Sequence, residues 1–296
     1  MIRSFTLIFV LAFVSAAAFP AANRPAAVPT PAPAPGGPAN VFYGGVNPAS
    51  PNAPVLLFVH GLGSNAMYWF TGGNDMYSDA YNAGYRTVYI SMNADNSGNS
   101  APIAQNAATL QQLLPGILAY YKTSSVYLVC HSKGGLDAQD AMLSPAFMSS
   151  VKGVFTLASP NQGDALADWA YGKGNPIAAR LGMLSPGLSD LQTSVVGPLR
   201  IQLDPLFSVS GIPFYTLEGN NFRAEKSVFY GITGPILKSL TGGEDNDGLV
   251  AVEEVPLPVT YAQDMGQVSA DHTHVGYGSI SWASVAAHLP VPLVKR

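Results

Sequence analysis

The chain has 296 residues, of which 48% are hydrophobic and 11% charged, with a formal net charge of −4. An average soluble domain carries about 25% charged residues, so this composition is unusually apolar. A mildly acidic chain without a basic cluster offers no electrostatic footprint for nucleic acid or anionic lipid, and 10% aromatic residues argue against disorder. The single cysteine excludes a disulfide within the chain.

The N-terminal segment has the pattern of an export signal. Residues 1–3 are a short basic region, residues 5–14 are apolar, and residues 15–18 are small, as at a cleavage site. We expect cleavage after Ala18, with no lipid anchor because no cysteine follows it. No later segment approaches the roughly 20 apolar residues of a membrane-spanning helix. Export without an internal disulfide favours a bacterial protein that is secreted or held in the cell envelope.

A segment rich in Pro and Ala follows, over residues 19–40. Proline fixes the backbone and removes hydrogen-bond donors, and alanine has little surface to bury. We therefore predict a signal peptide over 1–18, a semi-extended linker over 19–40 and one catalytic domain over 41–296.

Short apolar runs alternate with helical patterns along this domain. Strands are predicted at 55–59, 87–91, 125–129, 151–157 and 213–217, and helices at 101–121 (with a kink at Pro115), 134–143 and 281–289. Runs of this kind are buried on both faces, so the alternation predicts an α/β fold with a mostly parallel central sheet flanked by helices. Ligands of such sheets bind at the carboxyl ends of the strands, where candidate site residues are sought.

The run at 125–129 is followed by Cys130-His131-Ser132-Lys133-Gly134-Gly135. A serine at a sharp strand-to-helix turn is a nucleophile elbow, which needs small residues two positions before and after it because strand and helix pass close together. Gly134 meets this need, and Cys130 stands where glycine is usual. Ser132 is the candidate nucleophile; the alternative is a serine that only caps the helix.

The run at 55–59 is followed by His60-Gly61-Leu62-Gly63-Ser64-Asn65. Glycines on both sides of Leu62 let the backbone approach a reacting carbonyl group. We expect the N–H groups of Leu62 and Lys133 to form an oxyanion hole. In isolation the same string would fit an ordinary tight turn, but an elbow about 70 residues later strengthens the assignment.

Together with FTLASPNQG and NDGLV, these strings resemble the α/β-hydrolase superfamily, and within it the secreted bacterial lipase/esterase type (triacylglycerol lipase-like). The strings occur in family order and cover most of residues 52–290. The resemblance implies the α/β-hydrolase fold, a triad in the chain order Ser, Asp or Glu, His, and no cofactor.

The acid of the triad has four candidates, Glu218, Glu244, Asp245 and Asp247. Residues 246–250 resemble the Asn-Asp-Gly-Leu-Val segment of secreted bacterial lipases, in which the Asp before Gly orients the catalytic histidine. By this resemblance, Asp247 is the predicted acid that orients the catalytic histidine. An acidic turn that caps the next element is one alternative, and a calcium site near Asp245 and Asp247 is another, although no complete EF-hand loop is present.

The base has two serious candidates among five histidines. His60 and His131 belong to the oxyanion and elbow strings, and His288 falls in the last predicted helix. The family register of a histidine followed by an aliphatic residue and then glycine fits His272, which we select as base. His274 fits a shorter His-Ile-Gly string of some small lipases and is the alternative. A His-x-His metal site with Asp271 would leave Ser132 without a base, so no metal is expected.

The apolar composition of residues 160–212 predicts a helical cap over the site. The alternative is that this segment forms extra helices of the core. The segment is rich in apolar side chains, and Met67, Tyr68 and Trp69 are candidates for the opposite wall of an acyl pocket.

The implied activity is that of a secreted serine hydrolase that cleaves carboxylic esters of hydrophobic acyl chains. The low proportion of charged residues favours neutral substrates, either small-molecule esters or lipid esters. Lipid esters would be bound at a lipid–water interface. An extracellular polyester (polyhydroxyalkanoate-type) depolymerase is the alternative within this chemistry. An acyltransferase and a non-catalytic secreted binding protein are the alternatives from other classes.

Overall fold

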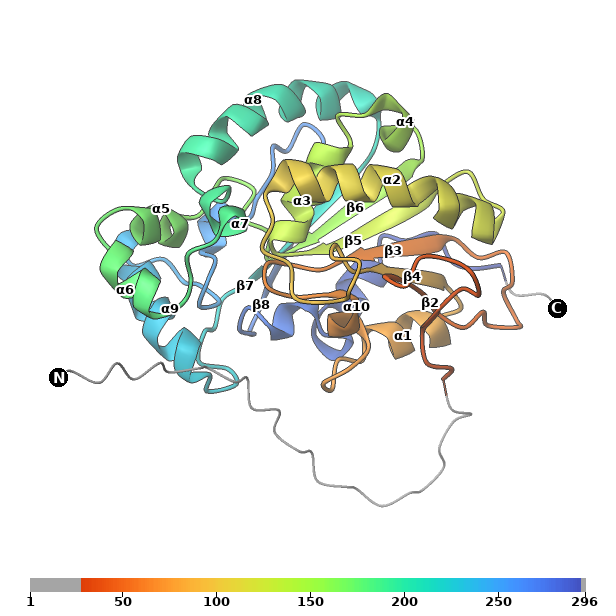
Figure 1. Ribbon diagram of the computed structural model, residues 1–296, viewed down its shortest axis with the longest axis horizontal. Coiled ribbons are helices and arrows are strands. Elements are labelled where there is room, and N and C mark those ends of the chain that lie inside the picture. Colours follow the sequence, from red (N-terminus) through yellow and green to blue (C-terminus); the bar gives the residue numbers. More distant parts are fainter. Residues whose placement is uncertain (1–27, 294–296) are drawn as a thin grey trace, which may run out of the picture.

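The computed structural model describes residues 28–293. Their central element is an eight-stranded sheet (Figure 1). In spatial order the strands are β1 (Ala32–Pro33), β2 (Val41–Tyr43), β4 (Arg86–Ile90), β3 (Val55–Val59), β5 (Val126–His131), β6 (Val151–Leu157), β7 (Phe214–Gly219) and β8 (Ala262–Val268). The β1–β2 and β2–β4 pairs are antiparallel, and every later pair is parallel. The mostly parallel sheet is thereby confirmed, and β3 to β7 match the five predicted strands.

Helices cover both faces of this sheet (Figure 1). One face packs against α2 (Ile103–Tyr121), α3 (Lys133–Ala141), α4 (Pro145–Met148) and α8 (Thr193–Ser210). The other face packs against η1 (Ala66–Trp69), α1 (Met76–Asn82) and α10 (Gly278–Ala286). The 3₁₀ turns η2 (Val252–Glu254) and η3 (His274–Gly276) lie in the C-terminal loops.

Four further helices gather at one end of the sheet, on the left of Figure 1. They are α5 (Ala165–Tyr171), α6 (Asn175–Arg180) and α7 (Pro186–Ser189), which follow the carboxyl end of β6, and α9 (Val228–Leu240), which follows β7. Their position is dictated by topology, because a chain leaving a parallel strand emerges at the carboxyl edge.

Burial explains why the central strands form. All five residues of β3 are at most 1% exposed, so they contact helices on both faces. Burying a large apolar side chain contributes roughly 1.5–3 kcal/mol. The long helix α2 buries residues spaced three and four apart, among them Ala107, Leu110 and Leu114, against the same core. It continues through Pro115 as one helix.

The structure differs from the sequence prediction at the sheet edges. β8 has the polar sequence AQDMGQV with no fully buried residue, so it lacks the apolar run of a central strand. β1 lies within the predicted linker, yet it pairs with β2, and the Tyr77 hydroxyl donates a hydrogen bond to the Pro29 carbonyl. Residues 28–40 therefore pack on the domain rather than standing outside it.

The expected signal peptide and residues 19–27 of the linker lie outside the described residues. Between residues 28 and 293, no helix has both the length and the hydrophobicity required to cross a bilayer.

Candidate active site

Ser132 lies in the sharp turn between β5 and α3, with φ +55° and ψ −135°. An L-residue at positive φ is strained, and such strain is held only where the surrounding packing fixes the turn. A Cβ atom at Gly134 would lie 2.4 Å from the carbonyl oxygen of His60, and one at Gly61 would lie 2.7 Å from the Ser132 Cβ. Both glycines are therefore required by the close approach of the β3 loop to the elbow. Cys130 is fully buried and fills the position where the family usually has glycine.

His272 connects Ser132 with Asp247. Its Nε2 lies 2.9 Å from the Ser132 Oγ, and its Nδ1 lies 2.7 Å from Asp247 Oδ2. An ionised carboxylate only accepts hydrogen bonds, so Nδ1–H donates to Asp247 and Nε2 is free to accept the serine proton. The structure brings together the three residues predicted as nucleophile, acid and base, in the geometry of a Ser-His-Asp triad. Their catalytic roles stay a prediction.

Asp247 is held by the turn that follows α9. Its Oδ1 accepts hydrogen bonds from the N–H groups of Leu249 (2.9 Å) and Val250 (2.8 Å), and its carbonyl accepts one from the His272 N–H at 2.9 Å. Gly248 has φ +106°, and a Cβ atom there would lie 2.7 Å from Tyr230. The NDGLV string is thus a turn that fixes a fully buried carboxylate next to the imidazole.

The electrostatic surroundings suit His272 as a base. Burial alone lowers its pKa, but the charge of Asp247 and the hydrogen bond to it outweigh burial, so the pKa lies above its usual value of 6.5. The charge of Asp164 also raises this pKa. A raised pKa makes the imidazole a stronger acceptor of the serine proton.

The other candidate base, His274, is turned toward a different acid. Its Nδ1 lies 2.7 Å from Asp271 Oδ1, and no hydrogen bond joins it to Ser132. The segment around both histidines is fixed by the Tyr68 hydroxyl, which donates to the Thr273 carbonyl at 2.7 Å. His131 adds a hydrogen bond of 2.7 Å from its Nε2 to the His272 carbonyl.

The predicted oxyanion donors belong to the two segments that come into contact at Ser132. Lys133 is the first residue of α3, and Leu62 lies in the turn after β3. No backbone hydrogen bond among residues 28–293 uses the N–H of either residue. His60 supports the Leu62 turn: its Nε2 accepts from the Met92 N–H, so its Nδ1–H donates to the Gly61 carbonyl at 2.8 Å. Burial lowers the pKa of His60 to about 4, so the ring is neutral.

None of the remaining acid candidates is hydrogen-bonded to His272, whose Nδ1 is paired with Asp247. Glu218 is buried on β7, and the exposed Asp245 pairs with Lys238 at 2.9 Å. Glu244 is exposed. Within the described residues, no group of three or more His, Cys, Asp or Glu side chains is arranged to hold a metal ion. Asp245 and Asp247 thus have separate partners, Lys238 and His272.

One acidic pair near the triad was missed by the sequence analysis. Asp164 caps α5 by accepting from the N–H groups of Leu166 and Ala167, and Glu254 accepts from the Ala165 N–H at 2.7 Å. Burial raises the pKa of Asp164 to about 7 and that of Glu254 to about 9, and the charge of Asp164 raises the pKa of Glu254 further. Only the tertiary structure joins these carboxyls, since they lie 90 positions apart.

The expected walls of the site are only partly realised. An apolar cluster formed by α5 to α8 packs against the Leu62 side chain, and a Cβ atom at Gly187 of α7 would lie 2.7 Å from Leu62 Cδ1. Trp69, expected in the opposite wall, is instead fully buried and packs on Phe58 with ring centroids 5.0 Å apart. Met67 is 38% exposed and stays available to a ligand.

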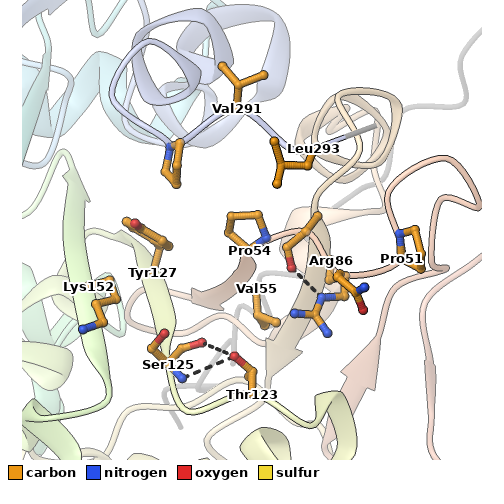
Figure 2. A pocket seen from close by; sticks show the side chains of 13 residues that line it. Pro51, Pro54, Val55, Arg86, Thr123, Ser125, Tyr127, Lys152, Val291 and Leu293 are labelled. Carbon is orange, nitrogen blue, oxygen red and sulfur yellow. Dashed lines mark hydrogen bonds between the residues drawn. The ribbon is translucent and has the colours of Figure 1, made fainter. Parts of the chain in front are cut away.

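A pocket of about 600 Å³ lies elsewhere, at the amino ends of the parallel strands (Figure 2). Val55, Arg86, Ser125 and Lys152 are among its lining residues. The Arg86 guanidinium donates hydrogen bonds to the carbonyl groups of Ala53 and Tyr121. Because this pocket contains no residue of the triad, it is separate from the candidate active site.

The titration of Glu218 provides a test of the folded structure. Both of its carboxylate oxygens lack a hydrogen-bond partner among residues 28–293, and burial followed by the nearby charge of Asp264 raises its pKa to about 8. The unfolded value is about 4.3. The folded state therefore binds more protons between these values, and the free energy of unfolding decreases as pH rises through this window.

We expect Glu218→Gln to weaken the pH dependence of stability between pH 5 and pH 9 while ester hydrolysis is retained. Thermal unfolding of both proteins across this range is the measurement. An unchanged slope would show that Glu218 is ionised in the folded protein.

Comparison with known proteins agrees with this architecture. Residues 42–173 match a family model described as a domain of unknown function (DUF7379), and no curated protein matches. The mature form of Bacillus licheniformis lipase BlEst2 is 29% identical, with a TM-score of 0.70, over 83% of this chain and 96% of that one. Its propeptide form is also 29% identical, with a TM-score of 0.73, over 86% of this chain but 54% of that longer one. The fold, the site geometry and these similarities together show that the chain has the α/β-hydrolase fold and is similar to the lipase BlEst2 over most of its length.

Proposed function

We propose that this protein hydrolyses carboxylic esters of hydrophobic acyl chains through an acyl-enzyme on Ser132. The observation that carries the proposal is the pair of hydrogen bonds by which His272 joins Ser132 to the buried Asp247. A serine hydroxyl is a weak nucleophile, and a neighbouring base in this arrangement activates it.

The reaction proceeds in two halves. His272 Nε2 takes the proton from Ser132 as Oγ attacks the ester carbonyl carbon, and the carbonyl electrons move onto oxygen. The N–H groups of Leu62 and Lys133 stabilise this oxyanion, each contributing about 3 kcal/mol. The C=O bond then re-forms, the bond to the alcohol breaks, and His272 protonates the alcohol. Water repeats the sequence on the acyl-enzyme and releases the acid.

The preference for hydrophobic acyl chains rests on the surroundings of Leu62. Apolar side chains of α5 to α8 pack around it, including Leu188, Leu191 and Val196. We propose that these helices form the cap that binds the acyl group. An apolar pocket with few polar groups selects ligands by apolar area.

We also propose that the protein is exported and acts outside the cytoplasm. This rests on the signal-like pattern of residues 1–18 and on the low proportion of charged residues. Sequencing the N-terminus of the protein recovered from the culture medium tests it, with an N-terminus after Ala18 as the supporting result.

The direct test of the proposed chemistry is covalent labelling. A fluorophosphonate is expected to attach to Ser132, to compete with p-nitrophenyl esters, and to leave Ser132→Ala unlabelled. Peptide mapping by mass spectrometry identifies the modified residue. Attachment at another residue would contradict the proposal.

The substrate class is then decided by rates. We expect hydrolysis to increase with acyl-chain length, and a rise above the solubility limit of the ester would indicate a lipase. Clearing of a polyester film would instead favour a depolymerase, and ester exchange with an added alcohol in preference to hydrolysis would favour an acyltransferase.

A further inference from the structure

A buried polar side chain on α2 connects the two segments that carry the predicted oxyanion donors. Asn106 is 2% exposed, and its carboxamide nitrogen donates to Asp137 Oδ2 at 2.8 Å and to Asn99 Oδ1 at 2.9 Å. Both N–H hydrogens of this amide are therefore used. Neither the acyl-enzyme chemistry nor the triad accounts for these bonds.

The first branch leads to Lys133. Asp137 accepts a hydrogen bond from the Lys133 ammonium group at 2.5 Å, and both side chains are at most 2% exposed. The two residues are one helical turn apart in α3, whose first N–H is that of Lys133. A buried ion pair is stable only when its remaining hydrogen-bonding sites are satisfied, and Asn106 satisfies one of them.

The second branch leads to the Leu62 turn. The Asn99 carbonyl accepts a hydrogen bond of 2.6 Å from the Gly63 N–H, and the Asn99 N–H donates to the Ser64 carbonyl at 3.0 Å. A Cβ atom at Gly98 would lie 2.5 Å from the Gly63 carbonyl oxygen, so the two loops are in close contact. Leu62 directly precedes Gly63 and Ser64, the two residues that these backbone hydrogen bonds hold.

We propose that Asn106 is a positioning residue that fixes the separation of the Leu62 and Lys133 N–H groups, and so assembles the oxyanion hole before substrate binds. This inference rests on the proposed ester hydrolysis. The side-chain bonds Lys133–Asp137–Asn106–Asn99, continued by the backbone bonds of Asn99 to Gly63 and Ser64, connect two segments about 70 residues apart. Buried bonds of this kind are strong because water cannot replace them. Preorganised donors stabilise the transition state, and a displacement of about 1 Å can lower the rate about 100-fold.

The test is Asn106→Leu, with Gln111→Leu as the matched control. Gln111 lies on the same helix and also bonds to α3, through the Ala141 carbonyl at 3.0 Å, but it has no connection to the Leu62 turn. We expect Asn106→Leu to lower kcat about 10- to 100-fold with little change in KM. Gln111→Leu should leave both constants close to those of the unchanged protein.

A second measurement distinguishes positioning from a general loss of structure. An alkylboronic acid forms an anionic tetrahedral adduct with a nucleophilic serine, so its affinity depends on the oxyanion donors, whereas the affinity of the neutral alcohol product does not. Asn106→Leu should weaken the boronate in proportion to kcat/KM and leave the alcohol unaffected. If Asn106→Leu does not fold, Asn99→Ala removes the same acceptor from the chain while leaving the Lys133–Asp137 pair intact, and the same split is expected.

Equal constants for Asn106→Leu and Gln111→Leu, or a loss confined to KM, would overturn the positioning role. This failure is distinct from failure of the proposed function, which would appear as ester hydrolysis that persists in Ser132→Ala. All variants are compared at a temperature at which thermal unfolding shows each to be folded.

Discussion

Replacing Ser132 with alanine is expected to lower kcat for ester hydrolysis about a million-fold, with KM nearly unchanged. The substitution removes the hydroxyl oxygen that lies 2.9 Å from His272 Nε2, so no acyl-enzyme can form. Loss of the nucleophile from a serine triad costs about this factor, and the oxyanion donors leave a residual rate about 1,000-fold above that in water. Steady-state rates with a p-nitrophenyl ester, compared with the buffer rate, measure both quantities.

The fold should tolerate this change, which supplies the control. Ser132 is small, and alanine also fits the turn, although the strain of positive φ remains. An unchanged thermal unfolding midpoint would show that the lost activity is chemical. A decrease in kcat of less than about 100-fold would require another nucleophile and would contradict the proposed mechanism.

Replacing Asp247 with asparagine is expected to lower kcat about 10,000-fold. The hydrogen bond from His272 Nδ1 to Asp247 Oδ2 fixes the tautomer in which Nε2 accepts the serine proton, and asparagine removes the charge that stabilises the imidazolium. Loss of this carboxylate in a Ser-His-Asp triad has an effect of that size.

The pH profile should shift as well, in a direction that the pKa of His272 determines. The base must be unprotonated, so kcat/KM rises with pH, with a midpoint above 6.5 in the unchanged protein because Asp247 raises this pKa. In Asp247→Asn the burial effect dominates, so the midpoint moves to lower pH. A kcat/KM profile between pH 5 and pH 9 measures the shift.

The second histidine gives the contrast for this experiment. His274 pairs with Asp271 rather than with Asp247, so His274→Ala should retain most of the activity. A loss as large as that of Asp247→Asn would instead assign the base to His274, and would overturn the selection of His272.

The local motifs and their order in the sequence were sufficient to predict the central strands and most of the candidate site residues. Fully apolar runs such as Val55–Val59 predict central strands because both faces of such a strand must be buried, and the polar residues after them mark the carboxyl edge. The choice of Ser132, Leu62 and Lys133 followed from small residues that a close strand–helix crossing requires. The choice of Asp247 and His272 needed the resemblance to known lipases as well.

Only the tertiary structure decided the features that depend on contacts between distant segments. The polar edge strand β8 is specified by its pairing with β7 and not by its own pattern, and residues 28–40 pack on the domain because Tyr77 and β2 bind them. The selection of Trp69 for the site wall was wrong, because its indole fills the core. Asn106 had no sequence signal, since a buried amide is recognised only by its partners, Asp137 and Asn99, on two other segments. Local patterns record what each segment buries, whereas hydrogen-bond partners depend on which segments the fold brings together.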